Sequence, residues 1–127
     1  MREKRRFIRF YIALKVNYIL QKDPKTEKIG TTKDVSAGGL QLLTSEQLEA
    51  GGKVDLKIFL PDALNPVHLK GVVMWSKELG QAKGPAHSHS AGIEFGKIEE
   101  DNKNTFLKFL CGQMYEKTGD KKPGDNA

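Results

Sequence analysis

The alternation of apolar and polar residues constrains the fold of this chain more than any other feature. Between residues 12 and 20 an apolar side chain occupies every second position, with Lys15 and Asn17 on the opposite face. Such period-two spacing predicts a half-buried strand. The same alternation returns between residues 53 and 60 and stops at Pro61, because proline cannot donate to a β-ladder. The chain is therefore expected to be built mainly from short strands.

Turn signals divide the chain into six such segments, and one change of period follows them. Strands are predicted over residues 11–20, 27–35, 40–44, 53–60, 67–75 and 91–95. Phe106, Leu107, Leu110 and Met114 then recur at helical spacing behind an acidic run at 99–101, which suits a helix N-terminus. We expect an all-β fold with one helix, namely a six-stranded antiparallel β-barrel followed by a C-terminal α-helix.

The same patterns predict where two chemically distinctive side chains lie. Trp75 shares its alternation phase with Val67, Leu69 and Val73, so its ring is predicted to lie in the barrel core. Cys111 lies on the apolar side of the predicted helix, so its thiol is predicted to be buried.

Positive charge is concentrated at the N-terminus. The net charge is +5, and residues 1–9 hold five basic residues and one acid, so only +1 remains for the other 118 residues. A nucleic-acid-binding protein is expected to spread Lys and Arg along a face that meets many phosphates. A concentrated basic arm instead suits a small ligand of high charge density. Nucleic acid is therefore a disfavoured partner.

Composition also disfavours several classes of protein. No apolar run approaches the ~20 residues that a membrane helix needs, so membrane insertion is not expected. A single cysteine cannot form an internal disulfide, so a reducing cytoplasm is the expected location. One cysteine and three histidines in the whole chain do not favour a metal site. No nucleophile–base pair can be placed, so the chain is not expected to be an enzyme.

Two short motifs carry the functional information. Residues 5–9 (RRFIR) form an R-x-x-x-R with an additional arginine, and residues 34–39 (DVSAGG) form a D-x-S-x-x-G. In this order, the two motifs resemble those of the PilZ domain family. Residues 71–75 (GVVMW) are similar to the G-x-V-x-W strand of that family, and residues 91–95 (AGIEF) to its closing strand. The resemblance covers about residues 2 to 115.

The resemblance implies a barrel of PilZ type that serves as a receptor for the bacterial second messenger cyclic di-GMP. It places the ligand against five motif positions, with three neighbours as further candidates. The five positions are Arg5, Arg9, Asp34, Ser36 and Gly39, and the three neighbours are Arg6, Ala37 and Gly38. No cofactor is implied beyond that ligand.

The chemistry of these residue types agrees with such a ligand. Arginine forks match phosphate oxygens and the O6 and N7 atoms of guanine, and Arg5 and Arg9 would lie ~13 Å apart on one side of an extended arm. An ionised Asp34 suits the N–H donors of guanine, and Ser36 can donate or accept beside it. Glycines at 38 and 39 let a ligand approach the main chain. In isolation, however, Asp34 and Ser36 before two glycines are typical of a side-chain-capped turn.

The sequence therefore predicts a flexible basic arm over residues 1–10, a barrel with its helix over 11–116, and a disordered charged tail over 117–127. Ordering of the arm on cyclic di-GMP would signal to a protein partner, and the resemblance suggests motility, pilus or polysaccharide machinery. Two alternatives stay open: a small β-barrel that binds nucleic acid, and a degenerate PilZ adaptor that binds no nucleotide.

Overall fold

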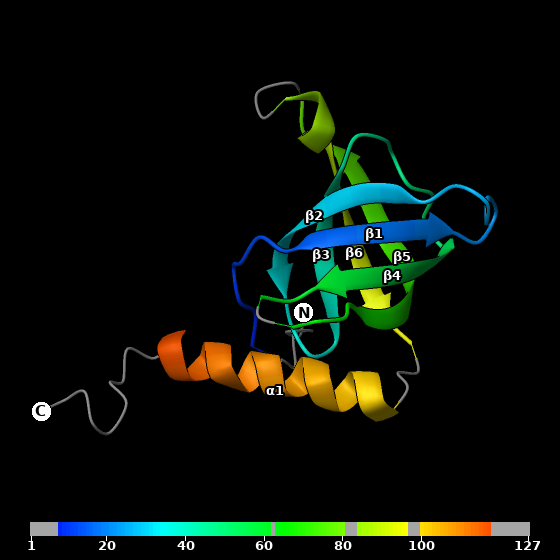
Figure 1. Ribbon diagram of the computed structural model, residues 1–127. Coiled ribbons are helices and arrows are strands. Elements are labelled where there is room, and N and C mark those ends of the chain that lie inside the picture. The colour runs from blue at the N-terminus through cyan, green and yellow to red at the C-terminus, as the bar shows by residue number, and fades with distance from the viewer. Residues whose placement is uncertain (1–7, 62, 81–83, 97–99, 118–127) are drawn as a thin grey trace, which may run out of the picture.

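The computed structural model describes residues 8–61, 63–80, 84–96 and 100–117, with the backbone alone at 100–103 and 114–117. Six antiparallel strands close into a barrel in the order β1-β2-β3-β6-β5-β4 (Figure 1). The strands are β1 (Lys15–Leu20), β2 (Lys28–Val35), β3 (Gly39–Thr44), β4 (Lys53–Phe59), β5 (Val67–Glu78) and β6 (His89–Phe95). A short 3₁₀ turn, Pro85–His87, precedes β6, and helix α1 (Glu100–Lys117) follows it. The predicted six-stranded barrel with one C-terminal helix is confirmed.

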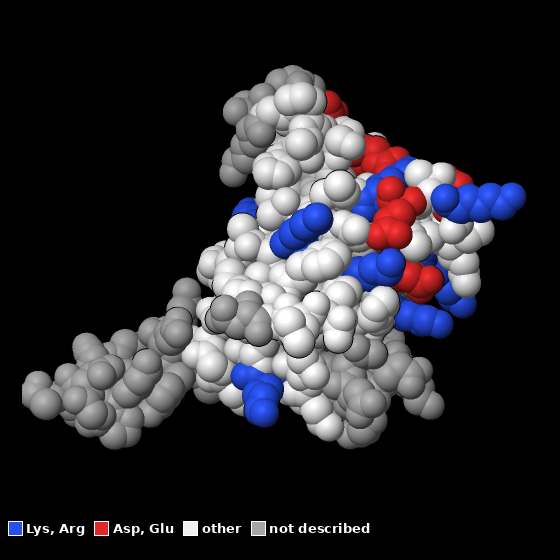
Figure 2. Space-filling model, viewed as in Figure 1, with Lys and Arg blue, Asp and Glu red and all other residues white. Residues whose placement is uncertain are grey.

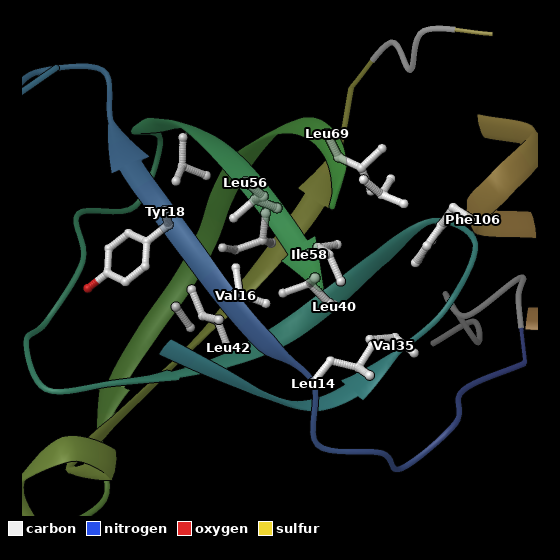
Figure 3. Packing of buried hydrophobic residues seen from close by; sticks show 14 of the residues in the cluster. Leu14, Val16, Tyr18, Val35, Leu40, Leu42, Leu56, Ile58, Leu69 and Phe106 are labelled. Atoms are coloured by element: carbon white, nitrogen blue, oxygen red, sulfur yellow. The ribbon is translucent and has the colours of Figure 1, made fainter. Parts of the chain in front are cut away.

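The alternating side chains fill the barrel interior (Figure 3). Val16, Tyr18, Leu56 and Ile58 are each at most 1% exposed, as the period-two pattern of their strands requires. Burial of each such side chain contributes on the order of 2 kcal/mol. The barrel is therefore closed over a packed core, and a ligand has to bind on its outside or at its rim.

Helix α1 lies across one end of the barrel (Figure 1). Phe106 is fully buried, and its ring meets Phe95 edge-on at a centroid distance of 5.5 Å. Leu110, one turn further on, is also buried. The aromatic contact fixes the helix against the last strand, at the end of the barrel where β2 finishes and β3 begins.

The predicted burial of Cys111 is wrong, because its thiol is exposed. Successive residues of an α-helix are rotated by about 100°, so Cys111 turns well away from the side on which Leu110 packs. The predicted apolar stripe is confirmed at Phe106 and Leu110, whereas the side chain of Met114 lies outside the described residues.

The predicted burial of Trp75 is also wrong, since 39% of the residue is exposed. Strand β5 carries an extra residue between Val73 and Trp75, where its register with β6 shifts by one. A bulge of this kind moves every later side chain to the opposite face. Val73 therefore faces the core, and Trp75 faces outward.

Strand β5 is longer than the alternation predicted. It continues to Glu78, and its last two residues pair with His89 and Ser90 of β6. The strands predicted from the sequence end at residue 75 and begin again at residue 91. Only its first half pairs with β4, so the β5–β6 hairpin projects beyond the barrel (Figure 1). Trp75 lies on the strand that leads into this projection.

Candidate functional site

Phe10 anchors the described end of the predicted basic arm, while Arg5 and Arg6 lie outside the described residues. Phe10 is 4% exposed and forms an antiparallel bridge with Val35 at the end of β2. The Phe10 N–H donates to the Val35 carbonyl at 2.8 Å, and the Val35 N–H donates back to the Phe10 carbonyl at 2.9 Å. This bridge holds the neighbouring Arg9 at the edge of β2.

Arg9 and Asp34, from the two motifs, form an ion pair. The Nη1 of Arg9 donates to Oδ1 of Asp34 at 3.2 Å, although the residues lie 25 positions apart in the chain. The side chain of Asp34 is 4% exposed and that of Arg9 is 34% exposed. The Nε of Arg9 is buried and donates to no described residue. A guanidinium carries five N–H donors, so most of those on Arg9 are not used by Asp34.

A bulge sets the direction of Asp34. Strict alternation after Thr32, which pairs with Leu42 of β3, would have turned Asp34 into the barrel. The register between β2 and β3 instead shifts at Lys33, so that Val35 pairs with Leu40 in the core and Asp34 pairs with Gln41 on the outer face. On that face the guanidinium of Arg9 lies against Asp34.

Ser36 caps the turn between β2 and β3. Its Oγ accepts hydrogen bonds from the backbone N–H groups of Gly38 and Gly39, each at 3.2 Å, and lies 3.2 Å from the Gly39 carbonyl, to which it donates. The Gly38 carbonyl accepts from the Phe95 N–H at 2.9 Å, and Ala37 packs against the core. The structure thus gives the D-x-S-x-x-G motif a local role as a capped turn, which is compatible with a ligand role for the same residues.

Gly39 has a packing role of its own. A Cβ at this position would lie 2.2 Å from the carbonyl oxygen of Ile93 on the neighbouring strand β6. Glycine is therefore required because β3 and β6 approach closely, whether or not a ligand binds there. The backbone of Gly39 does not adopt the left-handed conformation.

The outer face next to Asp34 forms a continuous row across four strands. Asp34 of β2 pairs with Gln41 of β3, Gln41 with Gly92 of β6, and Gly92 with Trp75 of β5. At a strand spacing of about 4.8 Å this row is ~14 Å long. We call Arg9, Asp34, Gln41, Gly92 and Trp75 the outer row. It begins at a charged pair and ends at an exposed aromatic ring.

The middle of the outer row is flat. A Cβ on Gly92 would lie 2.3 Å from the indole Nε1 of Trp75, so the ring lies across the glycine. Lys77 holds its ammonium 5.6 Å from the centroid of the same ring. The side-chain amide of Gln41 forms no hydrogen bond with a described residue. The row therefore offers unused amide donors and acceptors beside an aromatic surface.

Sequence reasoning missed Gln41, Gly92 and Trp75 as candidate site residues. The outward phase of Gln41, between the buried Leu40 and Leu42, was a usable signal. Nothing in the sequence indicates the bulge that exposes Trp75, because its position depends on the pairing of β5 with β6.

On the face shown in Figure 2, the described Lys and Arg side chains form no wide basic surface. Acidic and basic side chains intermingle there over the end of the barrel that carries the β1–β2 turn. Two hollows, of about 450 and 370 Å³, are lined by other residues of β1, β4, β5 and the adjoining loops and include no residue of the outer row. The candidate site lies instead on the outer face of β2, β3, β6 and β5.

The clearest electrostatic perturbation lies at the barrel end away from Phe106 (Figure 3). The Tyr18 hydroxyl donates to Glu46 at 2.9 Å, and Lys28 forms an ion pair with the same carboxylate at 2.8 Å. Burial, together with the Glu46 carboxylate, raises the pKa of Tyr18. Burial also acts to raise the pKa of Glu46, but hydrogen bonds from Lys28 and Tyr18 outweigh it and lower that pKa. This network includes no residue of the outer row.

Among the described side chains, no group of three His, Cys, Asp or Glu residues is arranged to hold a metal ion. Within the same part of the chain, no helix has both the length and the apolar character needed to span a bilayer.

Comparison with known proteins gives a family match and several similar structures. The family model for the PilZ domain matches residues 3–111. No curated protein matches the sequence.

Three solved structures illustrate the likeness. The PilZ domain of YcgR from Escherichia coli, solved with c-di-GMP, is 13% identical with a TM-score of 0.68, and the match covers 94% of this chain and 100% of that one. MotI/DgrA, an inhibitor of motility from Bacillus subtilis, is 18% identical with a TM-score of 0.70, covering 91% and 53%. MrkH from K. pneumonia, in complex with c-di-GMP, is 15% identical with a TM-score of 0.70, covering 94% and 56%. The chain thus spans about half the length of MotI/DgrA and MrkH, with which it shares the fold.

Proposed function

The chain belongs to the PilZ domain family, and from that premise we propose that it is a receptor for cyclic di-GMP and not an enzyme. The observation that carries the proposal is the Arg9–Asp34 ion pair, which joins the two motifs at the head of the outer row. Support also comes from the YcgR domain and MrkH, two similar structures that were solved with c-di-GMP.

The outer row matches the chemistry of a bis-guanylate. Cyclic di-GMP has two phosphates and two guanines, and the free donors of Arg9 suit a phosphate oxygen or the O6 and N7 edge of guanine. The amide of Gln41 can donate to and accept from a base edge. The face of Trp75 can stack on a base, which does not require a particular hydrogen-bond pattern. The ~14 Å length of the row is sufficient for a compact ligand with two bases.

The arm supplies the second side of the site in this proposal. Arg5 and Arg6 would fold over the bound nucleotide, with the bridge between Phe10 and Val35 acting as the fixed end. A ligand shifts a conformational balance only through contacts that differ between the two states, and the arm provides that difference. The ordered arm would present a new surface to a protein partner, for which the family suggests motility, pilus or polysaccharide machinery in the cytoplasm.

Asp34 has two roles in this scheme. With only 4% of its side chain exposed, it first serves to hold Arg9 in place. Acceptance of guanine N–H donors by its carboxylate, as the motif suggests, requires Arg9 to move aside or to share the carboxylate with the base. Binding is therefore coupled to the position of the arm.

Direct titration with three ligands at two salt concentrations tests the function. We expect cyclic di-GMP to bind much more tightly than GTP. Its affinity should depend only weakly on the salt concentration. Single-stranded DNA that binds well at low salt and is lost at high salt would support a nucleic-acid module instead. No binding of any ligand at millimolar concentration would leave the degenerate adaptor as the better explanation and overturn the proposal.

Replacement of Trp75 by alanine tests the far end of the outer row. We expect the affinity for cyclic di-GMP to fall about tenfold, within the 1–3 kcal/mol that base stacking contributes. The free energy of unfolding should fall as well, because Trp75 is only 39% exposed and its ring packs across Gly92, so affinities are compared at a temperature where both proteins are folded. Isothermal titration measures the loss. Trp75→Phe should retain most of the affinity, and Met74→Ala, at an exposed apolar neighbour, should be neutral; equal losses in both alanine variants would refute base stacking.

A further inference from the structure

The segment that connects the arm to β1 crosses an irregular part of the barrel. Strand β1 pairs with β2 only as far as Lys15 opposite Thr31. The next bridge along this edge is that of Phe10 with Val35, and Thr32 makes the hydrogen bonds between the two. Between them, β2 carries the bulge at Lys33. Residues 11–14 therefore lie outside any continuous ladder, and something else has to fix their path.

Thr32 provides three hydrogen bonds to this segment. Its Oγ1 accepts from the Leu14 N–H at 2.8 Å and donates to the Ile12 carbonyl at 2.6 Å. Its own backbone N–H donates to the Leu14 carbonyl at 2.9 Å. Thr32 is 1% exposed, so neither water nor a mobile side chain replaces these bonds easily. One hydroxyl thus satisfies two backbone groups on alternate residues of the connecting segment.

We propose that Thr32 is a positioning residue for ligand binding, which acts by clamping residues 12–14 and thereby fixing Phe10 and Arg9. The expected effect on affinity rests on the proposed function, whereas the hydrogen bonds of Thr32 to residues 12–14 do not depend on it. Residue 12 lies only two positions from Phe10, whose bridge places Arg9 beside Asp34. Release of residues 12–14 would let Phe10 and Arg9 move, and holding them in place on the ligand would then cost more conformational entropy.

A valine at position 32 removes the hydroxyl while preserving the shape of the side chain. We expect Thr32→Val to weaken cyclic di-GMP binding about fivefold in isothermal titration, whereas Thr32→Ser, which keeps the hydroxyl, should bind within about twofold of wild type. Thr44→Val is the matched control. Thr44 is also fully buried, and its Oγ1 donates to the Glu46 carbonyl at 2.6 Å. It lies at the end of β3 that is away from the Ser36–Gly39 turn. This variant should retain wild-type affinity.

Amide hydrogen exchange tests the clamp without a ligand. In the wild type, the Leu14 amide should be protected to the same degree as the amides of β1. In Thr32→Val, the amides of Phe10, Leu14 and Val35 should exchange at least about tenfold faster, with no such change in Thr44→Val. An unprotected Leu14 amide in the wild type overturns the clamp even if the valine variant does not fold.

The outcomes separate the clamp from the proposed function. If wild type ignores cyclic di-GMP, the receptor function fails, and hydrogen exchange alone decides whether Thr32 holds the segment. If wild type binds and Thr32→Val binds equally well, the positioning role is refuted. A similar loss of affinity in Thr32→Val and Thr44→Val would also refute it, since the loss would then follow general destabilisation.

Discussion

Replacement of Arg9 by alanine is expected to weaken cyclic di-GMP binding by about tenfold to a hundredfold, the largest binding effect that we predict for a single side chain. The reason is twofold. The variant loses a guanidinium fork that is already held at the site by Asp34 and Phe10, and it also frees the carboxylate of Asp34 from its partner at 3.2 Å. Isothermal titration at fixed pH and ionic strength measures the change.

Two further variants identify the cause of that loss. Arg9→Lys keeps the charge but cannot form two parallel hydrogen bonds, so it should bind clearly more weakly than wild type. Lys57→Ala removes a cation whose ion pair with Glu27 lies on the outside of β4, and it should have no effect on affinity. Full affinity in Arg9→Lys would show that charge alone is sufficient, and full affinity in Arg9→Ala would remove the outer row from the proposed site.

Replacement of Gly39 by alanine is expected to lower the free energy of unfolding by about 3 kcal/mol, even without ligand. The added Cβ would lie 2.2 Å from the Ile93 carbonyl oxygen, a backbone atom that cannot rotate away. The strands β3 and β6 would have to separate at the turn that carries the motif. Chemical denaturation of the ligand-free protein measures the change.

Gly112→Ala is the control for this prediction. A Cβ at Gly112 meets no other atom within 4 Å, and the residue lies inside helix α1, so alanine should stabilise the protein by about 0.5–1 kcal/mol. If Gly39→Ala is as stable as wild type but no longer binds cyclic di-GMP, the glycine serves ligand approach and the packing explanation fails.

The alternation of residues was sufficient to predict most of the architecture. The positions of all six strands and the helical period follow from side chains close in sequence, and the core residues of β1 and β4 have the phase that the pattern predicts. The predicted start of the first strand was too early. Tyr11 and its neighbours to residue 14 lie before β1, because the bulge in β2 removes the partner ladder there.

The candidate site was only partly predictable. The motifs named Arg9 and Asp34, which the structure brings into contact, and Ser36, which it places in a capped turn. Gln41 and Trp75 were missed, because their place beside Asp34 follows from three successive strand pairings between segments far apart in the chain.

The sequence by itself determined which segments become strands, where the helix lies and which residue types the motifs contain, since these depend on local periodicity and local chemistry. Only the tertiary structure decided which way Asp34 and Trp75 face. Each follows a single-residue bulge, at Lys33 and between Val73 and Trp75, and a bulge reverses the face of all later side chains. The position of a bulge is set by pairing with a distant strand, so it cannot be predicted from the alternation within one strand.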